Sequence, residues 1–101
     1  MSRYELPCHR EDHEAVCGWD APLETYFCEV WRIRAKSSTS VLWLGGFPRE
    51  VPHAEDMIAP LAPFAVLDEA MIARLKADRA AGLDRAPTAL QRQGLRALST
   101  K

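Results

Sequence analysis

The run from Leu23 to Arg34 constrains the fold most, because it is the strongest strand signal in the chain. β-branched and aromatic residues recur in it at a spacing of two, which is typical of a strand with one buried face. A polar stretch, 35–40, and an apolar run, 41–45, follow it. We therefore predict a β-hairpin of about residues 23–34 and 41–45. Residues 1–6 are compatible with a further edge strand that ends at Pro7, which cannot donate to a ladder.

The two faces of the long strand differ in composition. The odd positions are the more apolar and are predicted to face the core: Leu23, Thr25, Phe27, Glu29, Trp31 and Ile33. If Arg34 pairs with Val41, Arg32 lies opposite Trp43 in a cation–π contact. A slip of one residue would exchange the faces of the second strand and turn Trp43 inward.

Helical signals come after the hairpin. Pro52 suits a first helical position, and Asp68 is a suitable cap for a helix over 69–81 that Gly82 would stop. Residues 88–91 have capping-box spacing before a last short segment. Strands followed by helices predict an α+β domain, a small antiparallel sheet covered on one face by two or three short helices. We expect one compact domain over residues 1–83 and a basic helix or tail over 84–101.

Length and composition indicate one small globular domain. The chain has 101 residues, of which 48% are hydrophobic and 27% charged. No apolar run approaches the roughly 18 residues of a membrane span, and the first residues lack a secretory-signal pattern. Three cysteines cannot form a complete disulfide framework, so a reducing compartment fits better. These features predict a cytoplasmic protein without membrane contact.

Charge is distributed unevenly along the chain. Residues 1–73 carry 6 Lys/Arg and 12 Asp/Glu, whereas residues 74–101 carry 7 Lys/Arg and 2 Asp/Glu. One hypothesis is a nucleic-acid-binding regulator that contacts phosphate through its basic C-terminal residues, Arg85, Arg92, Arg96 and Lys101. The alternatives are a solvated helix face or attraction between the two parts of the chain.

A second hypothesis is a zinc site between Cys8 and Cys17. The candidate ligands are Cys8, His9, His13 and Cys17, and a helix would bring the last three, spaced by four, to one face. If the segment is a strand, that facial arrangement is lost and the residues form an exposed polar stretch. The paired Cys-x-x-Cys spacing of a strong zinc signature is missing, and the glutamate of a zinc-protease helix is misplaced. No cofactor is otherwise expected.

The sequence favours a non-enzymatic role. Cys17 or Cys28 could pair with His13 or His53 as a nucleophile and base, but no recognisable motif surrounds either cysteine. Gly45 and Gly46 do not lead into the helix of a phosphate-binding loop. We therefore name no catalytic residue.

The remaining interpretation is a protein-interaction or regulatory module. Its expected surface combines an aromatic turn residue with the second face of the hairpin: Trp19, Tyr26, Arg32 and Trp43. Tryptophan is enriched in binding hot spots, although one in a turn is also commonly a local core residue. Self-association through a sheet edge is the other expectation, because a small sheet leaves pairing groups open.

Three segments carry a resemblance: Leu6–Arg10, Gly18–Phe27 (GWDAPLETYF) and Val41–Gly45. Together they are similar to a loose group of bacterial proteins of about this length and of unassigned function. The likeness covers roughly the first two-thirds of the chain and fades in the basic C-terminal segment. It implies a bacterial cytoplasmic setting, and no activity, cofactor or site residue.

Overall fold

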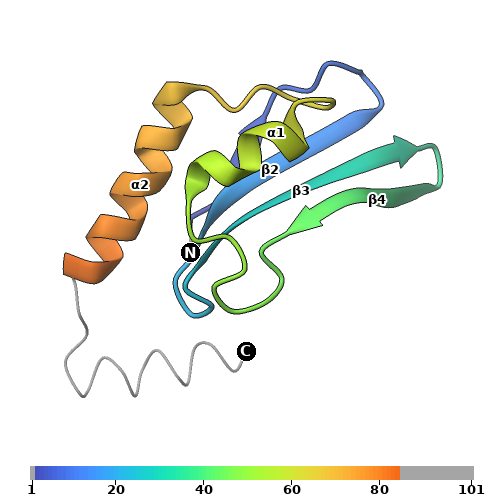
Figure 1. Cartoon of the computed structure of the whole chain (residues 1–101). Coiled ribbons are helices and arrows are strands. Elements are labelled where there is room, and N and C mark those ends of the chain that lie inside the picture. Colours follow the sequence, from blue (N-terminus) through green and yellow to red (C-terminus); the bar gives the residue numbers. More distant parts are fainter. Residues whose placement is uncertain (1, 85–101) are drawn as a thin grey trace.

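The computed structural model describes residues 2–84, in which four strands precede three helical segments (Figure 1). In chain order they are β1 (Tyr4–Leu6), β2 (His13–Asp20), β3 (Thr25–Arg34), β4 (Ser37–Leu44), the 3-10 helix η1 (Ala54–Met57), α1 (Ile58–Leu61) and α2 (Glu69–Asp84). The predicted α+β class with a small antiparallel sheet is confirmed. Most of the expected basic segment, residues 85–101, lies outside the described part.

The sheet is a meander in which each strand pairs with its neighbour in the chain. The spatial order is β1-β2-β3-β4, and every pairing is antiparallel. Tyr4 lies opposite Cys17, Cys17 opposite Cys28, and Cys28 opposite Leu44. The N-terminal strand that we expected is therefore present, and it ends before Pro7. The two edges of the sheet are β1 and β4.

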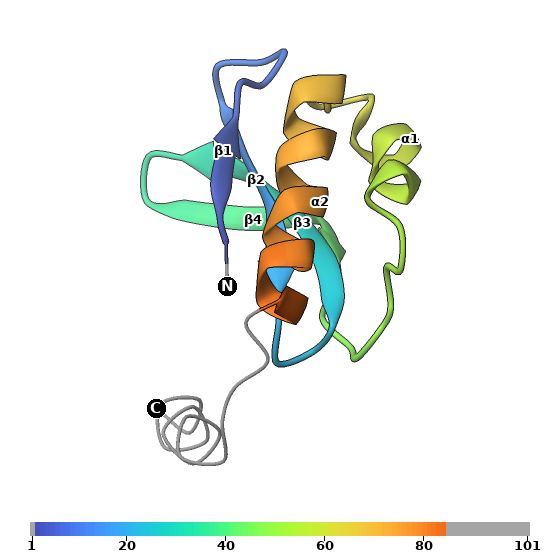
Figure 2. The ribbon, with the colours of Figure 1, turned by 90° about the vertical axis from the view of Figure 1, so that its left-hand side faces the viewer.

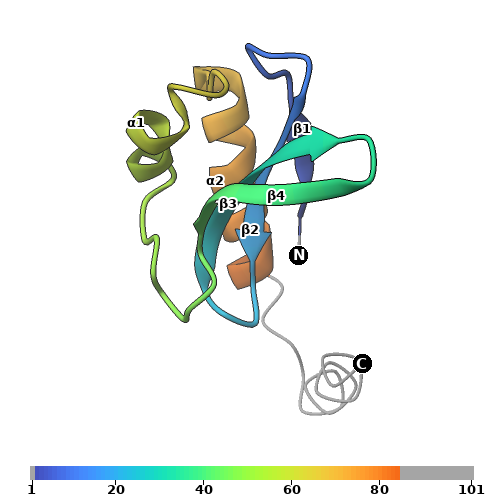
Figure 3. The same cartoon turned by 90° about the vertical axis from the view of Figure 1, so that its right-hand side faces the viewer.

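The core lies between the sheet and the helices, which sit together on one side of it (Figures 2 and 3). Cys17, Cys28 and Val30 point from the sheet into this layer and are fully buried. The helical segments contribute their own fully buried side chains, Met57, Leu61 and Leu75. One face of the sheet is thus covered, and we call the other the open face.

The predicted inward face of the long strand is wrong. The core takes the even-numbered side chains Tyr26, Cys28 and Val30, so Phe27 and Trp31 lie on the open face. Cys28 and Val30 are small enough for a helix to pack closely over them. The Phe27 and Trp31 rings lie on the opposite side, over which no helix of residues 2–84 packs.

The hairpin register also differs from the prediction. Val30 pairs with Leu42, and Trp31 pairs with Ser40, so Val41 is an extra residue that forms a β-bulge. Trp43 does lie on the open face, as expected, but opposite Glu29, while Arg32 faces Thr39. The expected contact between Arg32 and Trp43 is therefore wrong. The polar residues 37–40 belong to β4 instead of a loop, and this end of the hairpin extends beyond the helices (Figure 1).

The helices begin largely as the sequence indicates. The backbone N–H of Met71 donates to Asp68 Oδ1 at 2.8 Å, which confirms Asp68 as the cap of α2. Pro60 lies within α1, which is only four residues long. Helix α2 continues past Gly82 to Asp84, so the expected stop at Gly82 is wrong. No helix among residues 2–84 is both long enough and apolar enough to cross a membrane.

Candidate functional site

The open face is the most distinctive surface among the described residues. Strict alternation places one row of side chains across all four strands, in the order Glu5, Val16, Glu29, Trp43. Trp43 is 65% exposed, and Phe47, just beyond β4, is 73% exposed. Large apolar side chains that are exposed together mark interaction sites more often than isolated ones do.

Two glycines shape this surface. A Cβ atom on Gly18 would lie 2.6 Å from Phe27 Cζ, so the Phe27 ring occupies the space above this glycine. A Cβ atom on Gly46 would lie 2.9 Å from Trp43 Cζ2, so the indole rests against the backbone that leaves β4. The bare backbone at these two positions lets the rings lie close to the sheet.

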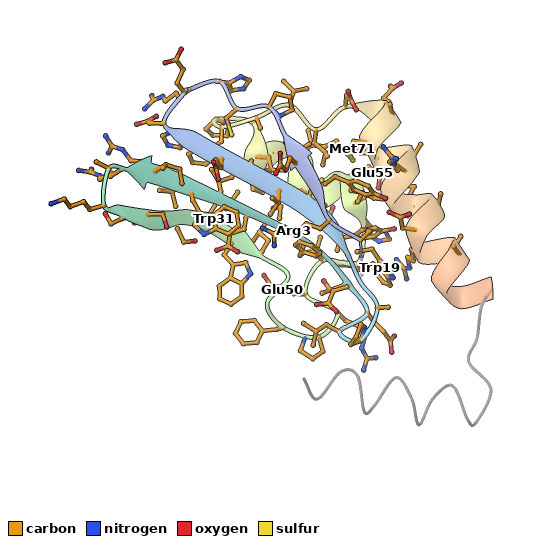
Figure 4. All side chains as sticks on the ribbon, turned by 180° about the vertical axis from the view of Figure 1, so that it is seen from behind. Arg3, Trp19, Trp31, Glu50, Glu55 and Met71 are labelled. Atoms are coloured by element: carbon orange, nitrogen blue, oxygen red, sulfur yellow. The ribbon has the colours of Figure 1, made fainter. Side chains whose placement is uncertain are left out.

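The middle of the open face is already a small apolar cluster. Val16 points to this side and is only 5% exposed, although none of the helices described between residues 2 and 84 covers it. The Arg3 guanidinium carbon lies 5.8 Å from the ring centroid of Trp31, a cation–π contact visible in Figure 4. Neighbouring side chains of the open face therefore supply the cover of Val16.

Three glutamate side chains share the open face with the aromatic rings. Glu5, Glu14 and Glu29 all point to the open face, because they pair with Val16, Trp31 and Val16 respectively. Arg3, a basic residue on this side, makes its cation–π contact with Trp31. The face thus combines an apolar centre with negative charge, which disfavours phosphate groups and favours a basic, apolar partner.

A second hollow lies on the helix side of the sheet. It is a cavity of about 340 Å³ lined by Tyr26, Pro52, His53, Ala54, Glu55, Lys76, Arg79 and Ala80. Its charged groups have partners within the chain. Lys76 Nζ donates to Glu55 Oε2, and Arg79 donates to the Pro52 carbonyl oxygen at 2.8 Å. Lys76 is the main reason that the pKa of Glu55 is lowered.

The four candidate zinc ligands are not brought together. His9 Nε2 lies 3.2 Å from the carbonyl oxygen of Ala62, and His13 Nδ1 lies 2.6 Å from Asp12 Oδ1. The expectation that a strand loses the shared face is wrong, because residues four apart point to the same side of β2, but the strand separates His13 and Cys17 by about 13 Å. Within residues 2–84, no three His, Cys, Asp or Glu side chains form a group that could hold a metal ion. Zinc binding remains a sequence prediction.

The cysteines have the properties of protected thiols. Burial is the main reason that the pKa of Cys17 is raised to about 11 and that of Cys28 to about 12. Burial also raises the pKa of Cys8, the third free cysteine. A thiol that keeps its proton is a poor nucleophile and a poor metal ligand.

The fold does not bring the four expected partner-binding residues to one exposed surface. Trp19 is 6% exposed and Tyr26 is 2% exposed, so both rings belong to the core instead of an open surface. Arg32 is exposed at the far end of the hairpin, where its Nε donates to Asp12 Oδ2 at 3.3 Å. Of the four, only Trp43 is on the open face. The expected nucleic-acid contacts, Arg85, Arg92, Arg96 and Lys101, lie outside the described residues.

Sequence reasoning missed two residues of the open face, Phe27 and Trp31, and also the exposed ring of Phe47 just beyond β4. The signal that could have placed the first two is the pair of smaller apolar residues Cys28 and Val30 at consecutive even positions of β3. Comparisons with protein-family models, with curated proteins and with solved structures find no match.

Proposed function

We propose that this protein is a non-enzymatic interaction module that binds a protein partner through its open face. The binding surface in this proposal has Trp43 and Phe47 at its exposed part and Phe27 and Trp31 beside the apolar centre. The bacterial cytoplasm expected from the sequence is the proposed setting, and the free thiols Cys8, Cys17 and Cys28 suit it.

One observation carries the proposal: among residues 2–84 no helix lies over the open face, which presents Trp43 at 65% exposure. Phe47, three residues beyond β4, is 73% exposed. Such rings lose contact with water when a partner covers them, and tryptophan is among the residues that most often dominate binding energy. Trp43 lies on a strand and rests against the backbone at Gly46, so its side chain loses little conformational entropy on binding.

The charges on the open face specify the chemistry of the partner. Glu5, Glu14 and Glu29 would repel phosphate and attract Lys or Arg side chains at the rim of an interface. We therefore expect an apolar protein segment flanked by basic residues. The alternative from the sequence, nucleic-acid binding, depends on Arg85, Arg92, Arg96 and Lys101, and this face gives it no support.

The test compares capture by full-length variants. A photoreactive residue replaces Phe47 in one protein and Ile58, 41% exposed on α1, in a matched control. We expect cross-linking of one cellular protein from Phe47 and none of it from Ile58. Purified partner should then bind Trp43→Ala about 30-fold more weakly, as expected for loss of a hot-spot residue.

The control for this affinity is Ile58→Ala, on the side of the sheet that carries the helices. It should bind the partner as the unchanged protein does. Full affinity in a folded Trp43→Ala, Phe47→Ala double variant would remove the open face from consideration.

A further inference from the structure

The outer edge of β4 is a second, separate surface. β4 is an edge strand of eight residues, whereas the opposite edge, β1, has three. Among residues 2–84, the backbone hydrogen bonds of β4 run only to β3. Half of its N–H and C=O groups therefore point away from the sheet, as in any edge strand.

β4 lacks the charges and prolines that usually protect an edge. Its sequence, Ser-Ser-Thr-Ser-Val-Leu-Trp-Leu, contains no charged residue and no proline. Natural sheets use a lysine, a proline, a very short strand or a β-bulge at an edge to prevent pairing with another chain, and of these β4 has only the bulge at Val41. The length and composition of β4 are those of an edge that accepts another strand.

The bulge at Val41 matches β4 to a second copy of itself. Residues directly opposite each other in an antiparallel pair point to the same face. In the end-to-end antiparallel register, the first residue of β4 in one copy lies opposite the last residue of β4 in the other. In a regular strand of eight residues these two side chains point to opposite faces, so two copies could not pair in this register. In β4 the bulge restores the match, because Ser37 and Leu44 pair with Arg34 and Cys28, both even-numbered residues of β3.

The charges at the two ends of β4 are also complementary. Lys36 lies in the exposed turn before the strand. Glu50 lies beyond its other end, where one carboxylate oxygen accepts hydrogen bonds from the N–H groups of Gly46 and Phe47 at 3.1 and 3.2 Å. End-to-end antiparallel pairing brings Lys36 of each copy to the end of β4 that carries Glu50 in the other. Two equivalent attractions result from the two-fold symmetry.

The same register covers an exposed ring. Trp43 of one copy lies opposite Ser38 of the other, and Ser38 is paired with Ile33 on the open face. Serine is small enough to leave room for the indole, which then reaches Ile33, 37% exposed in the single chain. Pairing thus buries apolar surface in addition to forming backbone hydrogen bonds.

We propose that two copies of this chain associate through β4 in this end-to-end register, joining their sheets into one sheet of eight strands. The two open faces then form one continuous surface on the same side of the dimer. This association shares Trp43 with the proposed partner binding, but the strand edge and Lys36 belong to the dimer alone, so Lys36→Glu separates the two proposals.

Sedimentation equilibrium of the full chain over a wide concentration range tests the proposal. The unchanged protein should reach a monomer–dimer equilibrium, and Lys36→Glu should weaken the dimer about tenfold at low salt, through two symmetric contacts. The double variant Lys36→Glu, Glu50→Lys should recover affinity, because each charge pair is restored with opposite signs. Trp43→Ala should weaken the dimer at any salt concentration.

The matched control is Val66→Ala, which removes an apolar side chain outside β4 that is 64% exposed, against 65% for Trp43, and should leave the dimer unchanged. Circular dichroism verifies that each variant is folded. A chain that stays monomeric up to millimolar concentration would overturn the proposal, whether or not a foreign extended peptide binds β4. A dimer that Lys36→Glu and Trp43→Ala both leave unaltered would overturn it as well.

Discussion

Trp19 and Tyr26 face each other across β2 and β3, with their ring centroids 4.9 Å apart and their planes inclined by 60°. Both rings point to the helix side, where the Arg79 guanidinium lies over them. Because side chains alternate along a strand, every second residue of β2 and β3 lies on the same side of the sheet as this pair. The aromatic residues of the other parity are left on the open face.

Replacement of Gly18 by alanine should destabilise the fold. The new Cβ would lie 2.1 Å from the carbonyl oxygen of Ser2 and 2.6 Å from the Phe27 ring, so backbone or ring must move. Overpacking of this kind costs about 1–3 kcal/mol. Urea unfolding, followed by circular dichroism, measures the change in the free energy of unfolding.

Gly82→Ala is the matched control. A Cβ at this position would meet nothing nearer than Trp19 Nε1 at 3.8 Å, and the residue lies within α2. Alanine has the higher helix propensity, so the variant should be more stable by about 0.5–1 kcal/mol. Equal effects of the two substitutions would contradict the contacts described for Gly18.

Thr25→Val should cost about 1–3 kcal/mol although it preserves side-chain shape. The Thr25 hydroxyl is fully buried, accepts from the Val51 N–H at 2.8 Å and donates to the Tyr26 carbonyl oxygen at 2.8 Å. Valine leaves the buried Val51 N–H without this partner. Thr25→Ser keeps the hydroxyl, so in urea unfolding it should lose clearly less stability than valine, and the reverse order would argue against the hydrogen bond.

Much of the fold can be predicted from the sequence because its local signals agree. The alternation in β3, Pro7 after β1 and Asp68 before α2 each specify a local structure without reference to distant residues. The hairpin register could not be predicted, since it depends on the bulge at Val41. Residues 37–40 resemble a loop because serine and threonine are common in loops, yet an exposed strand also tolerates their hydroxyls.

The candidate surface could be predicted only in part. Trp43 was expected on the second face of the hairpin, and it lies there. We expected Tyr26 and Trp19 beside it. Whether the odd or the even positions of β3 are buried depends on the side on which α2 packs, and the sequence of a single strand does not contain that information. Phe47 follows the strand, so alternation carries no information about its exposure.

Arg79→Met should lower the stability of the fold by about 1 kcal/mol. The guanidinium carbon of Arg79 lies 5.1 Å from the ring centroid of Trp19 and 5.7 Å from that of Tyr26. The Nη1 group of Arg79 also donates a hydrogen bond to the Pro52 carbonyl oxygen. Methionine keeps the apolar stem and loses the charge and the donor, whereas Arg79→Lys keeps the charge and should lose less in thermal unfolding. Identical losses in both variants would show that the charge contributes nothing, and no loss in either would show that the packed stem alone matters.

Alkaline pH should destabilise the fold through Cys17 and Cys28. Burial holds their pKa values at about 11 and about 12 in the folded chain, above the ordinary value of 9.0 that an unfolded chain restores. A pKa raised by folding means that the folded state holds the proton more tightly. The stabilising contribution is therefore complete below about pH 9 and is lost as pH rises from about 9 to 12. Urea unfolding at about pH 8 and about pH 10.5 should show this decrease.

The variant Cys17→Ala, Cys28→Ala separates the thiols from other alkaline titrations. Tyr4 also has a raised pKa, chiefly because its hydroxyl donates to Asp78, so some loss of stability remains in the double variant. The free energy of unfolding should nevertheless fall less steeply with pH, because unfolding at alkaline pH no longer releases protons from these two thiols. Alkylation gives an independent measure: in the folded protein, partly exposed Cys8 should react first, and Cys17 and Cys28 only at the rate of unfolding. Rapid native-state labelling of either buried thiol would contradict the burial that raises its pKa.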